Sequence, residues 1–92
     1  MPKIITAPII YSIIGSHKSY VSGVYTTGNR LIPICNRKIG EAKPFENADA
    51  AKAAINKFHN PYNREYIIET KEFPEVVFYA TKIQLEKIKE EN

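Results

Sequence analysis

Residues 42–58 read AKPFENADAAKAAINKF, and this stretch decides the fold because it predicts the helix around which the other elements are arranged. Alanine, the best helix former, is the commonest residue from Ala48 to Phe58. Asn47 is a good N-cap, and Asp49 in the first turn complements the helix dipole. An apolar stripe at helical spacing predicts that one side of this helix packs on a sheet; it comprises Ala51, Ala54, Ile55 and Phe58.

Three β-strands are predicted before this helix, at residues 9–14, 19–26 and 31–35. Gly28 and Asn29 form the clearest turn of the chain, so the second and third strands should pair antiparallel. Pro8 either limits the start of the first strand or places that strand at a sheet edge. Pro33 has no N–H and marks the third strand as an edge strand or a bulged one. Gly23 predicts a bulge in the second strand, which also lacks clean alternation.

Two further strands are predicted after the helix. Residues 59–63 turn the chain, residues 64–71 form a strand that Phe73 and Pro74 interrupt, and residues 75–80 form the last strand. Residues 81–92 favour a short exposed helix with Thr81 as its N-cap, while a strand and a frayed tail stay open as alternatives.

The predicted fold class is therefore α+β. A small antiparallel sheet, in the order β-β-β-α-β-β, packs under one alanine-rich helix, and a short C-terminal helix is optional. We expect one domain over residues 1–92, with its core at residues 9–80 and a tail at residues 81–92.

Charge is distributed unevenly along the chain, which has 92 residues and a formal net charge of +3. Residues 1–45 hold six basic groups and one acid, which leaves +5, whereas residues 46–92 hold seven basic groups and nine acids, which leaves −2. This asymmetry indicates an anionic partner for the first half. The alternative is that these Lys and Arg side chains only keep turns and strand edges soluble.

The cellular compartment follows from the cysteine count and the hydropathy. Cys35 has no second cysteine to pair with, which favours a reducing compartment and a buried, inert thiol. No apolar run approaches the roughly 18 residues of a membrane span, and the first residues lack a signal-peptide core. We expect a cytoplasmic protein, in the host cell if a phage encodes it, with no membrane partner.

Catalytic and metal-binding patterns are missing from the sequence. His17, His59 and Cys35 are scattered, and no short ligand spacing or glycine-rich phosphate loop occurs. We therefore assign no catalytic residue, no metal site and no cofactor, and we expect a protein that is not an enzyme.

Residues 39–55, with the run Ala42-Lys43-Pro44-Phe45 before Asn47, resemble a module that is common in small phage and prophage proteins of Gram-positive bacteria. Those proteins contain a hairpin, an Ala-Lys-x-Phe run, an alanine-rich helix and a returning strand, which residues 66–69 match here. The resemblance covers residues 9–70. It implies this fold, a phage-like origin and an action through binding host or phage macromolecules. Phe45 should also fold back on the first helical turns.

Two functions are compatible with these features. The first is a protein-interaction module that inhibits or modulates a host protein, with exposed tyrosines of the first hairpin as contacts: Tyr11, Tyr20 and Tyr25. The second is nucleic-acid binding by the basic first half, with these candidate contacts: Lys18, Tyr20, Tyr25, Arg30, Arg37, Lys38 and Lys43. Hairpin tyrosines are alternatively half-buried cross-strand partners.

Self-association into a homodimer is compatible with either function. A strand near a sheet edge or the final amphipathic stretch would pair with its copy. The candidate interface residues are Ile83, Leu85 and Ile88. The alternative is that this stretch packs on the sheet of its own chain.

Overall fold

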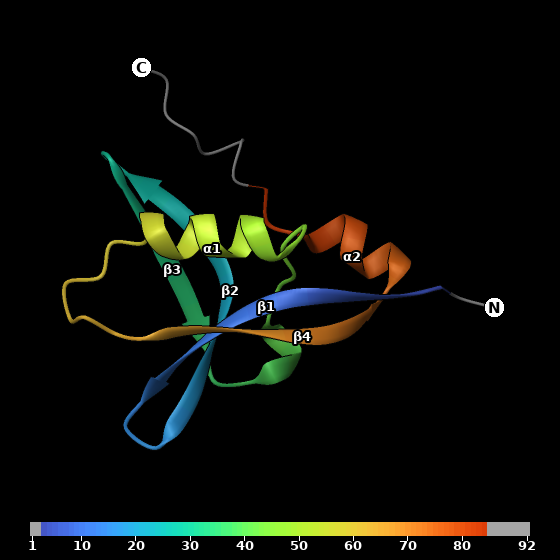
Figure 1. Ribbon diagram of the computed structural model, residues 1–92, viewed down its shortest axis with the longest axis horizontal. Helices are drawn as coiled ribbons and strands as arrows, with labels where there is room; N and C mark the ends of the chain where they lie inside the picture. The colour runs from blue at the N-terminus through green and yellow to red at the C-terminus, as the bar shows by residue number, and fades with distance from the viewer. Residues whose placement is uncertain (1–2, 85–92) are drawn as a thin grey trace.

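A computed structural model describes residues 3–84 as one antiparallel four-stranded sheet with two helices (Figure 1). The strands lie in the order β3-β2-β1-β4. Along the chain the elements are β1 (Ile4–Ile14), β2 (His17–Thr27), β3 (Arg30–Asn36), the 3-10 turn η1 (Ile39–Glu41), α1 (Ala48–Lys57), β4 (Tyr66–Pro74) and α2 (Glu75–Thr81). The fold class is α+β, as the sequence predicts.

Two tight turns connect the first three strands. Gly15 and Gly28 are each the first residue of a two-residue turn, and both have φ of +63°. A positive φ at the first turn position alone is the pattern of type II′ hairpin turns, whose twist matches that of the flanking strands. The predicted antiparallel pairing of the second and third strands is confirmed by the register of Thr27 with Arg30.

The bulge predicted at Gly23 is present. Val21 pairs with Cys35 and Gly23 pairs with Ile34, so Ser22 is one extra residue on β2. The Ser22 hydroxyl donates to the Ile34 carbonyl oxygen at 3.2 Å.

This bulge explains why β2 lacks alternation in the sequence. After the bulge, the β2 residues that point to the α1 side change from odd-numbered to even-numbered positions, because one residue of β2 is left unpaired. Val21 and Val24, three positions apart, therefore both pack on the core beside α1, while Tyr25 lies on the other face.

β1 and β2 pair only next to their turn and then diverge. Their register covers residues 11–14 of β1, and residues 42–45 fill the space beyond it. The Lys43 N–H donates to the Val21 carbonyl at 3.1 Å, and the Phe45 N–H donates to the Pro8 carbonyl at 2.9 Å. Residues 42–45 thus link two strands that do not pair with each other there.

Pro8 lies inside β1 rather than at its start, and β1 is a central strand, so the prediction for Pro8 is wrong. Proline fits because its carbonyl points to Phe45, away from its β4 partner Thr70. The N–H that Pro8 lacks would point the same way, since the N–H and C=O of one strand residue share a side. The missing donor therefore costs no bond between β1 and β4.

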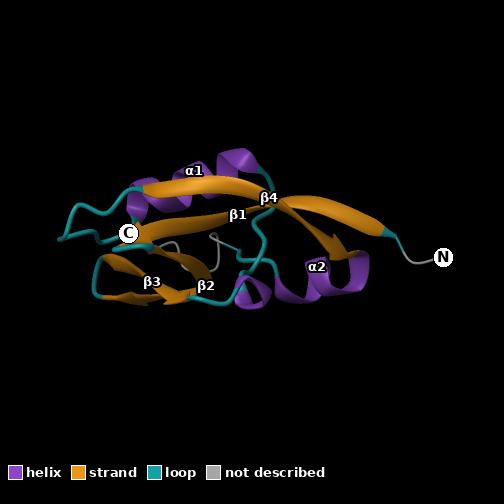
Figure 2. Cartoon of the chain, turned by 90° about the horizontal axis from the view of Figure 1, so that it is seen from below, coloured by secondary structure: helices purple, strands orange, loops and turns teal. Residues whose placement is uncertain are grey.

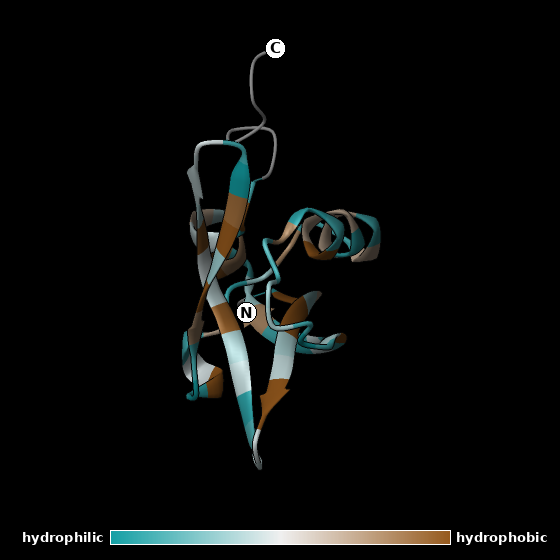
Figure 3. Ribbon diagram, turned by 90° about the vertical axis from the view of Figure 1, so that its left-hand side faces the viewer, coloured by the Kyte–Doolittle hydropathy of each residue, from teal (hydrophilic) through white to brown (hydrophobic). Residues whose placement is uncertain are grey.

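The two helices lie on opposite sides of β1 and β4 (Figure 2). On the α1 side the buried core includes Ile10, Val21, Leu31, Phe45, Ala51, Ala54 and Phe58. On the α2 side a second buried core comprises Ala7, Ile9, Tyr20, Ala42, Phe73 and Phe78. Neighbouring residues of β1 contribute to both cores, Ile9 to one and Ile10 to the other, because alternate side chains point to opposite faces. Figure 3 shows apolar segments of the strands in brown beside hydrophilic ones in teal. Helices cover both faces, whereas the sequence analysis predicts a single covering helix.

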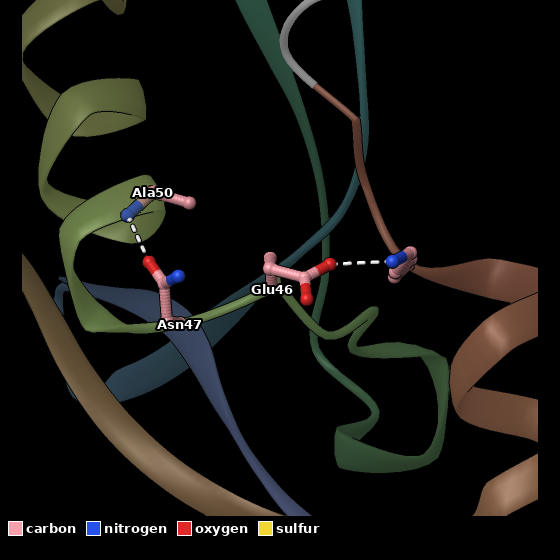
Figure 4. A network of polar contacts seen from close by, with 4 residues as sticks. Glu46, Asn47 and Ala50 are labelled. Atoms are coloured by element: carbon pink, nitrogen blue, oxygen red, sulfur yellow. Dashed lines mark hydrogen bonds and ion pairs between the residues drawn. The ribbon is translucent and has the colours of Figure 1, made fainter.

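Helix α1 forms as predicted. Asn47 is its N-cap, and the Asn47 side-chain oxygen accepts the Ala50 N–H at 2.8 Å (Figure 4). Beside it, the Glu46 carboxylate and the Lys82 ammonium form an ion pair, which ties the start of α1 to the chain after α2. Ala51 and Ala54 are fully buried, so small side chains allow α1 to lie close to the sheet.

Replacing the N-cap should destabilise the protein moderately. We expect Asn47→Ala to lower the free energy of unfolding by about 1 kcal/mol, because the Ala50 N–H loses its acceptor. Urea unfolding followed by circular dichroism measures this loss. Asn56→Ala, at an exposed position of the same helix, is the matched control and should cause no loss. Equal effects of the two substitutions would contradict the capping role.

The predicted last strand, residues 75–80, is wrong because these residues form α2. β4 also continues past Phe73 to Pro74, where the sequence analysis ends the strand earlier. Pro74 takes the N-cap position of α2, and only Phe78 of this helix is buried. A β-branched and aromatic composition favours a strand locally, but packing of one anchoring residue on the sheet decides otherwise.

Thr81 ends α2 instead of starting a helix, so its predicted role as an N-cap is also wrong. Its hydroxyl donates to the Val77 carbonyl one turn earlier, at 2.7 Å. Ile83 follows and is buried in the α1-side core, where its N–H donates to the Pro44 carbonyl at 2.9 Å. The core therefore extends from Ala7 of β1 into the stretch expected to be a tail.

Candidate protein-docking surface

The outer side of the β2–β3 hairpin is partly apolar and uncovered. Cross-strand register places Tyr25 opposite Ile32 and Gly23 opposite Ile34. Their neighbours Val24 and Leu31 pack in the α1-side core, so the side chains of Tyr25, Ile32 and Ile34 point to the opposite face of the sheet. Tyr25 is 49% exposed and Ile34 is 46% exposed. We call the surface formed by Tyr25, Arg30, Ile32 and Ile34 the hairpin face.

The hairpin face lies on the α2 side of the sheet but beyond the reach of α2. There the buried core consists of β1 and β4 residues with Tyr20, Ala42 and Phe78. Tyr20 lies before the bulge, at the end of β2 that pairs with β1. The part of β2 after the bulge, with β3 beside it, therefore presents its outer side chains to solvent.

A groove adjoins the hairpin face at the bulge. Its volume is about 420 Å³, and its lining includes Ser22, Gly23, Val24, Lys43, Tyr79 and Ile83. Gly23 belongs to both surfaces, because a Cβ at this position would lie 3.7 Å from the Ile34 Cδ1 atom. The groove exists because β1 and β2 diverge, which brings the residues after α2 next to the bulge.

The charged residues that line these two surfaces are basic. Lys43 lines the groove, and its ammonium lies 3.4 Å from the Glu41 carbonyl oxygen. Arg30 begins β3 and shares the hairpin face, since it pairs with Thr27 two positions after Tyr25. Lys82 also lines the groove, where it is bound to Glu46. An apolar strip between Arg30 and Lys43 suits a partner that carries acidic groups around an apolar contact.

The proposed nucleic-acid contacts are distributed over several parts of the sheet. The Lys18 ammonium lies 3.8 Å from the Glu69 carboxylate and 4.6 Å from the centre of the Tyr11 ring. Tyr20 is 7% exposed, and its ring centre lies 5.7 Å from that of Tyr11. Tyr20 is therefore a buried cross-strand partner whose ring is not open for stacking on a base. Tyr25 is exposed on the hairpin face.

Arg37 and Lys38 follow the last residue of β3, at the opposite end of that strand from Arg30. A strand of seven residues spans roughly 20 Å at its usual rise per residue. The structure thus does not unite Arg30, Arg37 and Lys38 in one patch. Lys43 lies beside Val21, whose β3 partner Cys35 is next to the end of the strand that Arg37 and Lys38 follow, so Lys43 lies away from Arg30.

Cys35 is half-buried, whereas the sequence predicts a buried thiol. Burial raises the pKa of the Cys35 thiol above its ordinary value, while a hydrogen bond with Ser19 and the charge of Arg64 lower it less. Burial also raises the pKa of Tyr66. Since the thiolate is the nucleophilic form, a raised pKa disfavours reaction at Cys35. Within residues 3–84, no three His, Cys, Asp or Glu side chains gather as a metal site would require.

The predicted self-association residues fall in two different places. Ile83 packs in the α1-side core of its own chain and borders the groove with the little surface it exposes, so it is not a free contact for a second copy. Leu85 and Ile88 lie outside the described residues. None of the helices that the structure describes is long and apolar enough to cross a membrane.

Most residues of this candidate surface are not predicted from the sequence. Ile34, Gly23 and Tyr79 are not among the predicted contacts, although Tyr25, Arg30 and Lys43 are. One signal does exist in residues 31–35, which are apolar at every position, while Pro33 marks an edge. An edge strand that is apolar on both sides predicts that one side lacks cover.

Comparisons of the chain with protein-family models, with curated proteins and with solved structures found no match.

Proposed function

We propose that this chain is a non-enzymatic interaction protein that binds an acidic, partly apolar protein surface through its hairpin face and the adjoining groove. The observation that carries the proposal is the uncovered pair Tyr25 and Ile34 beside the open groove. A tyrosine and an isoleucine next to a recess provide the aromatic and aliphatic anchors that dominate binding energy at protein interfaces.

Charge supports an acidic partner. Residues 1–45 carry six basic groups and one acid. Of these, Arg30 shares the hairpin face and Lys43 lines the groove, so both lie where a bound surface would meet them. Basic groups at the rim of an apolar contact attract acidic partners and disfavour basic ones, which gives specificity and a faster encounter.

The setting that we propose follows the resemblance of residues 9–70 to phage and prophage proteins. The chain would act in the cytoplasm of the host cell, where it would inhibit or modulate a host protein, and it would need no cofactor. The small size of the chain and the exposed apolar side chains of the hairpin face support this role.

Selection of peptides tests the proposed partner chemistry. The purified protein is immobilised and offered a displayed library of random peptides. We expect the enriched peptides to carry Asp or Glu around an aromatic or aliphatic residue, because Arg30 and Lys43 border the apolar contact. Enrichment of basic or purely apolar peptides would overturn the assignment of an acidic partner.

Nucleic-acid binding remains the second candidate, favoured by the exposed basic side chains of Arg30, Arg37 and Lys38. It predicts that the anisotropy of labelled duplex DNA, single-stranded DNA or RNA rises with protein and that binding weakens steeply between about 50 and 200 mM salt. The Arg37→Glu, Lys38→Glu double variant should then bind less tightly. We expect no such rise, because Arg30 lies at the opposite end of β3 from Arg37 and Lys38. Salt-sensitive binding by the wild type would favour the second candidate.

A further inference from the structure

The outer edge of β4 has free backbone groups along most of its length. The Pro8 carbonyl points away from β4, so Pro8 and its partner Thr70 form a pair without mutual hydrogen bonds. The N–H and C=O of Thr70 consequently point outward. The same holds for every second residue of β4, namely Tyr66, Ile68, Thr70 and Glu72. Within residues 3–84, the outward N–H and C=O groups of these four residues form no backbone hydrogen bond.

The opposite edge of the sheet is protected. Thr27 and Arg30 flank the two-residue turn and hydrogen-bond to each other, so the backbone groups of Arg30 point toward β2. The backbone groups of the alternate residues Leu31, Pro33 and Cys35 therefore point outward from the sheet. The Leu31 carbonyl accepts the His59 N–H at 2.8 Å. Pro33 has no N–H to offer. Proteins protect sheet edges against pairing in these ways, so an unprotected β4 beside a protected β3 points to a strand partner for β4.

The sequence of β4 is complementary to itself in one antiparallel register. With a two-fold axis at Thr70, the outward groups of Thr70 bond to those of Thr70 in the second copy. Glu69 of each copy then lies directly opposite Lys71 of the other, on the same face of the joined sheet. Moving the axis by one residue, to Glu69 or to Lys71, would set like charges directly opposite each other. The charges therefore favour an axis at Thr70 over either neighbouring residue, and this axis also pairs the whole of β4 with its copy, from Tyr66 to Pro74.

We propose that two copies of this chain pair through β4 around Thr70 and form a continuous eight-stranded sheet. The interface is separate from the hairpin face, because β4 and β3 are opposite edges of the sheet. Such a dimer would present two docking surfaces to a partner. This inference does not depend on the proposed function, because it rests on the strand edge alone.

Sedimentation velocity of the full chain tests the pairing. We expect the wild type to sediment as a dimer and Thr70→Pro to sediment as a monomer with an unchanged circular dichroism spectrum. Proline at this position removes only an outward N–H, which β1 does not use. A monomeric wild type would overturn the proposal, and so would a dimer that persists in Thr70→Pro.

Exchanging the charges of Glu69 and Lys71 tests the register, because recovery of the dimer in the exchanged variant cannot result from a loss of folding. Lys71→Glu places glutamates opposite each other twice and should raise the dimer dissociation constant roughly tenfold or more. The Glu69→Lys, Lys71→Glu double variant restores two opposite-charge pairs and should recover the dimer. The Lys52→Glu variant, at an exposed position of α1, controls for net charge because it changes the charge by the same amount as Lys71→Glu. A double variant that stays as weak as Lys71→Glu would refute this register.

Discussion

Phe45→Ala is expected to lower the free energy of unfolding by about 3–5 kcal/mol, the usual cost of removing a buried phenylalanine ring. Phe45 is fully buried between β1 and α1, in contact with the α1-side core. The backbone of residues 42–45 bridges the divergent strands β1 and β2, with the Phe45 N–H bonded to the Pro8 carbonyl, and this places the ring in the core. A domain of this size has little stability to spare, so the variant should be largely unfolded at room temperature.

Urea unfolding followed by circular dichroism measures this effect. Phe45→Leu keeps most of the apolar volume and should cost less than about 1.5 kcal/mol if the surrounding side chains adjust. Tyr62→Ala removes an aromatic ring that is exposed to solvent and serves as the control, with an expected change within about 0.5 kcal/mol. A loss below about 1 kcal/mol for Phe45→Ala would contradict the role of residues 42–45 as the link between the two strands.

The Tyr25→Ser, Ile34→Ser double variant is expected to weaken binding of a selected acidic peptide by about 100-fold or more. Two interface anchors that each contribute about 1.4 kcal/mol account for a 100-fold effect, and stronger anchors would exceed it. Both side chains are about half-exposed in the free protein. Their loss should therefore change the free energy of unfolding far less than it changes the affinity.

Fluorescence anisotropy of the labelled peptide measures the affinity. The matched control is Ile4→Ser, Val76→Ser, which removes two apolar side chains of comparable or greater exposure, 55% and 75%, at the other end of the sheet. This control should bind as the wild type does. Equal losses in the two double variants would show that exposed apolar area in general, rather than the hairpin face, determines binding.

The parts of the fold that local sequence determines could be predicted. Asn47 and the alanines after it define α1 without any knowledge of the rest, and Gly28 defines the β2–β3 turn. Gly23 marks the bulge and Pro33 marks an edge. Each of these residues acts through its own backbone preferences, which the sequence displays directly.

The parts that depend on distant segments could not be predicted. Val76 to Tyr79 have the composition of a strand, yet they form a helix because Phe78 packs on the sheet after Pro74 ends β4. Pro8 suits a central strand only because Phe45 approaches it from 37 positions away along the chain. The docking groove has the same origin, since residues near 22, 43 and 79 meet only where β1 and β2 diverge.

The most direct test of the docking surface is a titration of isotope-labelled protein with a selected acidic peptide, followed by amide chemical shifts. We predict that the largest shifts occur at Gly23, Tyr25, Ile34 and Lys43, which border the hairpin face and the groove. The amides of α1, on the other side of the sheet, should not shift. Shifts confined to α1 or to the outer edge of β4 would contradict the proposal that this protein binds its partner through the β2–β3 hairpin.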